Sequence, residues 1–191
     1  MNPSINYMPP QQFEQLLTAI PRLKIRRWQG GDVIMLFKIC YWCGLRISEG
    51  CKLEKESFDT EFRQVYLGIT KTNKGDHATI PEKFIPELQA YLLQKGTGRL
   101  FPGMNRYITY NWLKRLGVML EIKALTTPQS ETGEKTVTHI FRKSVGKDML
   151  YGTFGPRQPL NIVQQKLRHT NPLMTTKYLK ATDEDVRQAG W

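Results

Sequence analysis

Apolar residues near the start of the chain recur with the spacing of amphipathic helices. Within Gln11–Ile20 they fall at intervals of three and four positions, behind two prolines that a helix tolerates in its first turn. A second helix is predicted from Val33 to about Trp42, with Asp32 as its N-cap. Gly44 ends this helix, and a third is predicted from Arg46 to Leu53.

The middle of the chain changes from helical to strand-like patterning. Phe62–Thr70 is rich in β-branched and aromatic residues, Thr72–Asp76 carries turn residues, and His77–Ile80 again favours a strand. These features predict a small antiparallel sheet with Lys71 near its turn.

Helical patterning then dominates to the end of the chain. Thr138 is a good N-cap residue for one of these helices, and Lys123–Val137 is polar enough to indicate a loop. The predicted helices are Pro81–Gln94, Tyr107–Ile122, His139–Tyr151, Asn161–Leu167 and Leu173–Lys180. The expected fold class is therefore α+β, mainly α-helical with one small antiparallel β-sheet.

Length and charge narrow the class of protein. The chain has 191 residues, which fits one domain over residues 1–180 with a flexible lead over 1–8, followed by a tail over 181–191. Its 28 Lys and Arg against 17 Asp and Glu give a formal net charge of +11, which indicates a polyanionic partner such as double-stranded DNA. Neither a membrane-spanning run nor a signal peptide is evident, so a cytoplasmic location is expected.

The cysteines favour packing over metal binding. Cys40 and Cys43 have the spacing of half a zinc site, but neither a second such pair nor a histidine pair completes a ligand set. Together with Cys51 they are interpreted as reduced thiols in the core, and no metal or other cofactor is expected.

Six polar residues, spread over the chain in a fixed order, carry the candidate chemistry. Two arginines can clamp a phosphate through bidentate donors, histidines and a lysine can move protons, and a tyrosine can act as a covalent nucleophile. The six are Arg46, Lys71, His139, Arg142, His169 and Tyr178. Each taken alone also has a plain reading, such as an exposed Arg46–Glu49 pair, a surface lysine or a packed aromatic.

Their combination resembles the catalytic domain of the tyrosine recombinases, the phage integrase family. Gly44–Glu49 is similar to the family's first arginine box and Thr138–Ser144 to its His-x-x-Arg box. Leu167–Thr170 followed by Thr175–Tyr178 resembles the last box, with nine positions from His169 to Tyr178. The resemblance covers about Pro9 to Lys180.

The resemblance implies site-specific recombination or integration of DNA, as in mobile elements, without metal or ATP. Tyr178 would attack the scissile phosphate and form a 3′-phosphotyrosyl bond, while Arg46 and Arg142 hold its non-bridging oxygens. His139 would accept a proton or a hydrogen bond near the nucleophile, and His169 would donate to a non-bridging oxygen. Lys71 would be the general acid for the leaving 5′-oxygen, with Lys74 as its competitor, and Glu49 a supporting residue.

Basic residues around these positions are candidate phosphate contacts. They are Arg22, Lys24, Arg26, Arg27, Lys143, Lys147 and Arg168. For the cluster at 22–27, a solvated linker is an equal alternative. The resemblance also implies a homotetramer on paired DNA sites, in which the tail over 181–191 docks on a neighbouring protomer or packs on its own core.

Several departures from the family pattern leave alternatives open. Arg168 stands where a small residue is usual, Lys143–Ser144 follows Arg142 where His or Thr is usual, and the Lys123–Val137 loop is long. With the first arginine box at Gly44, no separate core-binding domain is expected, so the chain is either a catalytic fragment or a short member. A type IB topoisomerase-like relaxing enzyme and a catalytically weak DNA-binding protein are the competing functions.

Overall fold

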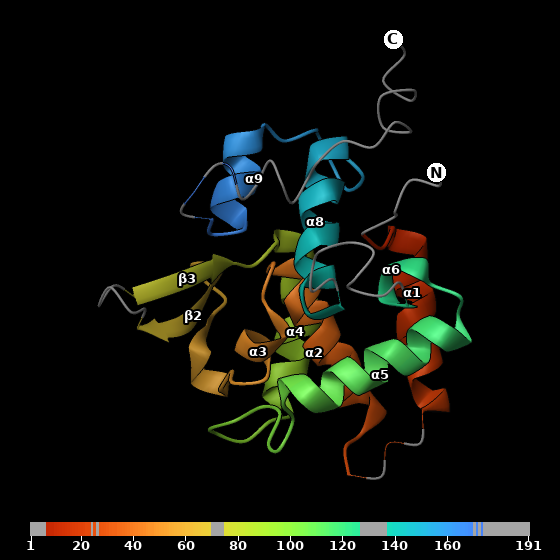
Figure 1. Ribbon diagram of the computed structural model, residues 1–191. Helices are drawn as coiled ribbons and strands as arrows, with labels where there is room; N and C mark the ends of the chain where they lie inside the picture. The colour runs from red at the N-terminus through yellow and green to blue at the C-terminus, as the bar shows by residue number, and fades with distance from the viewer. Residues whose placement is uncertain are drawn as a thin grey trace.

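The computed structural model of the protein describes residues 7–23, 25, 27–69, 75–126, 137–169, 171 and 173. Figure 1 shows a mainly helical molecule with one small sheet, which confirms the predicted fold class. Its α-helices are α1 (Pro10–Ala19), α2 (Gly30–Trp42), α3 (Ile47–Gly50), α4 (Ile85–Leu93), α5 (Arg106–Met119), α6 (Lys123–Thr126), α8 (Ile140–Tyr151) and α9 (Leu160–Lys166). Its strands are β1 (Phe58–Asp59), β2 (Gln64–Ile69) and β3 (Gly75–Thr79), and its 3₁₀ helices are η1 (Ile20–Arg22), η2 (Lys55–Ser57), η3 (Glu82–Phe84) and η4 (Val137–His139).

The central helix is α2, because it is buried on most of its faces and contacts α3 and α8. The prediction that Asp32 caps this helix was wrong, since the helix begins at Gly30 with Gln29 as its N-cap. Asp32 instead accepts hydrogen bonds from the Tyr91 hydroxyl at 2.8 Å and from Lys95 Nζ at 2.5 Å. Its carboxylate therefore joins α2 to the end of α4.

The sheet has the strand order β1-β2-β3, with antiparallel pairing throughout. Val65 pairs with Ala78 in the centre, and the register shifts between Tyr66 and Ile69, where Gly68 has a positive φ of 90°. This bulge gives the end of β2 an extra bend. The predicted strand began at Phe62, but β2 begins two residues later. The two-residue strand β1 was not predicted.

Several helix boundaries also differ from their predictions. The helix at Arg46 is one turn long, from Ile47 to Gly50, and the first part of the predicted 123–137 loop forms α6. The N-cap of α8 is His139 rather than the predicted Thr138, because Thr138 lies inside η4. Helix ends are the part of a fold that local patterns fix least.

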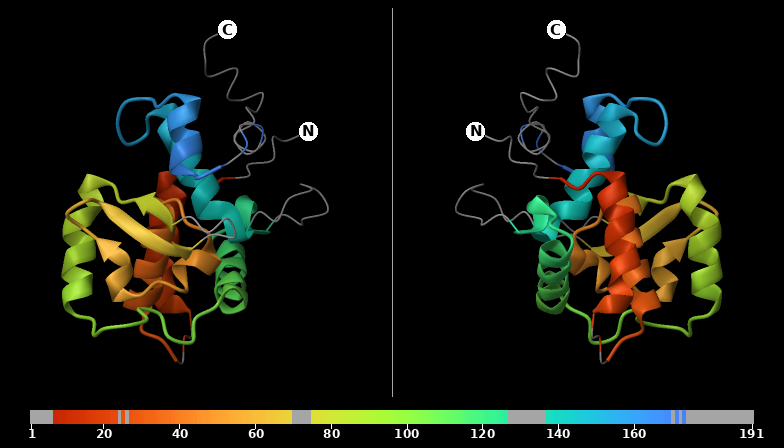
Figure 2. Two further views of the ribbon diagram at one scale, coloured as in Figure 1. Left: turned by 90° about the vertical axis from the view of Figure 1, so that its left-hand side faces the viewer. Right: turned by 90° about the vertical axis from the view of Figure 1, so that its right-hand side faces the viewer.

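Helix α9 and the far end of α8 project above the rest of the molecule, whereas the start of α8 lies in the main core (Figure 1). In both views of Figure 2 the sheet and α4 lie on one side of this pair and α5 lies on the other. Val145 of α8 packs with Val163 and Leu167 from the end of α9 in a small apolar cluster. Helix α9 is thereby held against α8 at the end that leads to His169.

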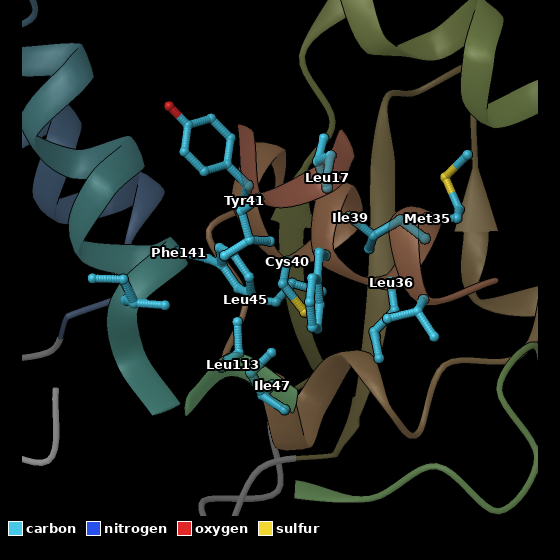
Figure 3. Packing of buried hydrophobic residues seen from close by; sticks show 14 of the residues in the cluster. Leu17, Met35, Leu36, Ile39, Cys40, Tyr41, Leu45, Ile47, Leu113 and Phe141 are labelled. Carbon is cyan, nitrogen blue, oxygen red and sulfur yellow. The ribbon is translucent and has the colours of Figure 1, made fainter. Parts of the chain in front are cut away.

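Aromatic side chains join α1, α2 and α8 in the main core. Tyr41 stacks on Phe13 with ring centroids 4.2 Å apart, and Phe141 packs against both Phe13 and Phe37. Figure 3 shows Phe141 beside the buried side chains of α2, with Ile47 of α3 and Leu113 of α5 close by. This core fixes the start of α8 relative to α2 and α3.

All three cysteines are free and buried in this core, which confirms their predicted packing role. Burial raises the pKa of the Cys43 and Cys51 thiols to about 11, so both are protonated at neutral pH. Among the residues that the structure describes, no group of three or more His, Cys, Asp or Glu side chains is arranged to hold a metal. No helix in that part of the chain reaches the length and apolarity needed to cross a bilayer.

Close packing of α3 on α2 requires a glycine at position 50. A Cβ added to Gly50 would lie 2.5 Å from Cys40 Sγ and 2.9 Å from Leu36 Cδ1. We expect Gly50→Ala to lower the free energy of unfolding by about 1–3 kcal/mol in denaturant melts, because overpacking strains both helices. The control is Gly31→Ala in α2, where nothing lies within 4 Å and the change is expected to be neutral or stabilising. Equal stability of the two variants would contradict the packing argument.

A buried carboxylate in α8 makes stability depend on pH. Burial raises the pKa of Asp148 to about 6 from 3.8, although hydrogen bonds from Tyr41 and Thr153 and the charge of Lys83 oppose the shift. The folded state therefore binds more protons than the unfolded state between about pH 4 and 6. The stability that comes from protonated Asp148 is lost as the pH rises through 6.

Asp148→Asn should remove that dependence. An amide oxygen can still accept the hydrogen bond from the Tyr41 hydroxyl, and asparagine does not titrate. The free energy of unfolding of the variant, relative to that of the wild type, should therefore rise by on the order of 2 kcal/mol as the pH increases from 4.5 to 7.5. Chemical denaturation at several pH values measures the difference between the two proteins. A constant difference across this range would show that Asp148 is ionised throughout.

Candidate active site

Arg46 is positioned by the turn that ends α2. Gly44 has a φ of +66°, and Leu45 N donates to Cys40 O at 2.8 Å, so the chain reverses and Arg46 becomes the N-cap of α3. The sequence predicted an anion site at a helix start, but α3 has only four residues and contributes little dipole. The positive charge at this position therefore comes from the Arg46 guanidinium, whose side chain is 39% exposed.

Glu49 holds Arg46 in place through both of its carboxylate oxygens. One carboxylate oxygen accepts from Arg46 Nη1 and the other from Arg46 N, both at 2.7 Å. The second oxygen also accepts from Arg168 Nη2 at 2.8 Å. Burial alone would raise the pKa of Glu49, but Arg168 and Arg46 lower it overall, so Glu49 is ionised at neutral pH.

Arg142 is buried completely in the first turn of α8. Its Nη1 donates to the Gly44 carbonyl oxygen at 2.9 Å, across 98 positions of sequence. This bond fixes α8 against the turn that precedes Arg46. His139 lies three positions earlier, as the N-cap of the same helix.

His169 follows α9 and is 7% exposed. Its backbone N–H donates to Gln164 O, and its carbonyl accepts from Gln164 Nε2, both at 3.1 Å. The preceding residue, Arg168, has a left-handed backbone with φ of 51°. This conformation turns the chain away from the helix axis and fixes the backbone of His169.

Electrostatics show that four of the six candidate residues converge. Burial lowers the pKa of His139 to about 4, and the charges of Arg46 and Arg142 add to the shift, followed by those of Lys143 and Arg106. Burial likewise lowers the pKa of His169 to about 4, with Arg142, Arg46, His139 and Arg168 contributing. Both imidazoles are thus neutral beside two guanidiniums at pH 7. Such a site favours an anion and contains proton acceptors that are not already charged.

The other two candidates, Lys71 and Tyr178, lie outside the described residues, as does Lys74. Their roles as general acid and nucleophile stay predictions. The tail over 181–191 and the predicted helix over 173–180 also lie outside, apart from residue 173.

The candidate phosphate contacts fall into three groups. Arg22 and Arg27 are exposed, whereas Lys24 and Arg26 lie outside the described residues. Lys143 and Lys147 are buried in α8, with Lys147 Nζ 4.7 Å from the Tyr7 ring centroid, which differs from the outward position expected for them. Arg168 is engaged by two carboxylates inside the protein. Of the candidate phosphate contacts that the structure describes, the exposed ones are therefore Arg22 and Arg27 rather than the lysines of α8.

Two residues near the site were not singled out from the sequence. Asp76 on β3 accepts from Arg168 Nη1 at 2.9 Å, and Lys166 Nζ donates to Thr79 O at 2.6 Å. Burial lowers the pKa of Lys166 to about 8. The arginine at position 168, where a small residue is usual in the family, is the sequence signal that pointed to this contact. Its partner could not be found from local spacing, because 92 positions separate the two residues.

Comparison with known proteins shows which family the sequence matches. A family model described as the phage integrase family matches residues 6–185. A tyrosine recombinase of Thermosipho africanus is 29% identical over 154 residues, which cover 77% of this chain and 49% of the relative. Tyrosine recombinase XerA of Thermococcus onnurineus is 25% identical over 183 residues, covering 94% and 59%. The chain thus spans about half the length of the curated relatives it matches.

Solved structures show the same fold at lower identity. The catalytic domain of bacteriophage HP1 integrase has a TM-score of 0.62 at 20% identity, covering 96% of this chain and 92% of that one. XerH recombinase bound to its difH substrate has a TM-score of 0.67 at 18% identity, covering 97% and 53%. The shared fold extends over nearly the whole of this chain.

The neutral state of the two histidines is directly measurable. We expect NMR titrations of labelled imidazoles to give midpoints near 4 for His139 and His169, so that both stay neutral down to about pH 5. Arg46→Ala should raise both midpoints, because a nearby cation is removed, but leave them below 6.5, because burial remains.

The matched control for this titration is Arg63→Ala. Arg63 directly precedes β2, is half-exposed and pairs with Glu82 rather than with the site. Its removal should leave both histidine midpoints unchanged. Wild-type midpoints at 6.5 would mean that the two imidazoles are neither buried nor surrounded by cations.

Proposed function

Because the chain belongs to the phage integrase family, we propose that it cuts and rejoins DNA strands at specific sites through a 3′-phosphotyrosyl intermediate. The observation that carries the proposal is the convergence of Arg46, His139, Arg142 and His169 from three distant segments of sequence. Two guanidiniums and two neutral imidazoles match the needs of a phosphodiester, whose single negative charge is shared by two non-bridging oxygens.

The two arginines stabilise negative charge on the phosphate. As the nucleophile approaches, charge grows on the non-bridging oxygens of the five-coordinate transition state, and preorganised donors stabilise it. Arg142 is held by the Gly44 carbonyl and Arg46 by Glu49, so neither guanidinium has to be ordered when DNA binds. Preorganisation of this kind lowers the activation barrier.

The two histidines accept a proton and donate a hydrogen bond, respectively. His139 has a lowered pKa and is neutral at pH 7, which supports its proposed role as acceptor for the Tyr178 proton. Neutral His169 retains one ring N–H, which supports the proposed hydrogen bond to a non-bridging oxygen.

The proposed cleavage step transfers the phosphate from the 5′-oxygen to the Tyr178 oxygen. The Tyr178 phenol oxygen forms a bond to phosphorus and gives its proton to His139, while the bond from phosphorus to the 5′-oxygen breaks. The leaving oxygen takes a proton from Lys71 and becomes a 5′-hydroxyl. One phosphodiester bond is exchanged for another, so rejoining is the reverse reaction and requires no ATP.

Double-stranded DNA is the proposed substrate. The net charge of +11 supports electrostatic binding, and Arg22 and Arg27 are exposed cations available to phosphates. Among the structural relatives, XerH is bound to its difH substrate and the Tn1549 transposon integrase to circular intermediate DNA. By likeness to these proteins, the activity belongs to DNA recombination and mobile elements.

Assembly on DNA is a further part of the proposal. We infer a homotetramer on paired sites, with the segment over 181–191 docking on a neighbouring protomer. The curated relatives are about twice as long as the matched region. A DNA grip additional to that of this domain is therefore expected in such proteins.

The proposal is tested by covalent capture on DNA. The substrate is a pool of duplexes that carry a randomised region and a nick, so that a released 5′-hydroxyl fragment diffuses away and traps the adduct. The wild type is expected to become covalently attached at a 3′-phosphate, and sequencing of the captured duplexes identifies the site. Tyr178→Phe should form no adduct, because it lacks the nucleophile.

Two variants serve as comparisons in the capture experiment. Tyr107→Phe removes a hydroxyl from a tyrosine that is 74% exposed on α5 and should form adduct at the wild-type rate. Arg142→Ala should lower that rate by about 10²–10³, as expected for loss of a transition-state donor. Salt-sensitive binding without any adduct would replace the proposal with a binding-only protein. Site-independent relaxation of supercoiled plasmid would replace it with a topoisomerase.

A further inference from the structure

Arg168 combines a strained backbone with a buried side chain whose two terminal nitrogens each contact a carboxylate. Its φ of 51° lies in the left-handed region that L-residues other than glycine, asparagine and aspartate seldom adopt. Its side chain is only 11% exposed. A residue kept in a strained conformation next to a candidate active site points to a role for the side chain itself.

The guanidinium of Arg168 joins two parts of the site. Nη2 lies 2.8 Å from Glu49 Oε2, and Nη1 lies 2.9 Å from Asp76 Oδ2. Glu49 in turn holds Arg46 through both of its carboxylate oxygens. The contacts thus form a continuous chain from Arg46 through Glu49 and Arg168 to Asp76. Each is a charge-assisted hydrogen bond with restricted geometry.

A second contact joins the same two segments. Lys166 Nζ, two residues before Arg168, donates to Thr79 O at 2.6 Å. The end of α9 is therefore attached to β3 near both ends of the strand, at Asp76 and at Thr79. Because β3 is paired with β2, these contacts fix the two paired strands relative to His169 and Arg46.

We propose that Arg168 and Asp76 are positioning residues that hold the β2–β3 hairpin in register with the phosphate-binding arginine Arg46. In the sequence, Lys71 lies between Ile69, where β2 ends, and Gly75, where β3 begins. The inference rests on the proposed function, in which Lys71 protonates the leaving 5′-oxygen. Breaking the Arg168–Asp76 pair then impairs protonation of the leaving group more than it impairs phosphate binding.

The distinguishing substrate replaces the bridging 5′-oxygen by sulfur at the captured site. Cleavage of this duplex breaks the phosphorus–sulfur bond and releases a 5′-thiolate, which needs no proton because a thiol is far more acidic than an alcohol. Any defect in placing the general acid is therefore relieved by sulfur. A defect in the arginines, or in folding, persists on both substrates.

Asp76→Asn is the sharpest variant, because it removes one carboxylate charge and leaves the Arg168–Glu49 contact in place. We expect its rate of adduct formation on the all-oxygen duplex to fall about 10- to 100-fold, as a displacement of about 1 Å would cause. On the sulfur duplex its rate should return to within about threefold of the wild type. Asp76→Glu, which keeps the charge, should recover part of the oxygen rate.

Arg168→Gly tests the same chain of contacts from its centre. Glycine adopts a positive φ without strain, so the variant is expected to fold with near wild-type stability. Its rate should fall at least as far as that of Asp76→Asn. Sulfur should rescue it only in part, because Glu49 and hence Arg46 also lose a partner.

Glu82→Gln is the matched control, since it makes the same chemical change in the exposed Arg63–Glu82 pair at the other end of β2. It should react like the wild type on both duplexes. A wild-type rate for Asp76→Asn, or an equal loss on oxygen and sulfur duplexes, would overturn the positioning role while leaving the proposed function intact. Absence of any wild-type adduct would overturn both.

Discussion

The hydrogen bond from the buried Arg142 guanidinium to the Gly44 carbonyl holds the candidate site together. A buried cation is costly unless its donors are engaged, so the start of α8 must sit where the turn after α2 can supply an acceptor. The same turn places Arg46 one residue after Leu45, at the N-cap of α3. One interaction thereby sets the separation of two arginines that are 96 positions apart in the sequence.

This constraint also determines the state of the histidines. His139 is fixed at the head of the helix that contains Arg142, and His169 is brought near by the packing of α9 on α8. Burial and the neighbouring guanidiniums together keep both imidazoles neutral. The site therefore concentrates positive charge on groups that cannot release protons at neutral pH, and leaves the histidines as acceptors or neutral donors. This division of roles suits a reaction that needs both charge stabilisation and proton transfer.

Spacing and turn residues within a few positions of each other predicted the parts of the fold and the site that form within one helix or turn. The interval between His139 and Arg142 places both at the start of one helix, and the glycine at position 44 marks the turn before Arg46. Long-range polar contacts had no such signal. Asp32 is a residue type that favours N-caps, but it binds Tyr91 of α4 and Lys95 just beyond that helix. The basic residues of α8 were predicted to contact phosphates, although most of this helix is buried. A charged residue in a helix does not reveal from sequence whether tertiary packing will enclose it.

The arginine at position 168 shows what such a contact can compensate. A left-handed residue between α9 and His169 is needed to turn the chain, and glycine meets that need without strain. With arginine at this position, the protein accepts backbone strain and gains a cation between Glu49 and Asp76. Without that cation, Glu49 would be paired with Arg46 alone, and Asp76 would lose its ion pair with Arg168. The charge of Arg168 thus lowers the pKa of Glu49, keeps it ionised and lets it hold Arg46 in a fixed orientation. The strain at residue 168 is therefore linked, through Glu49, to the order of Arg46.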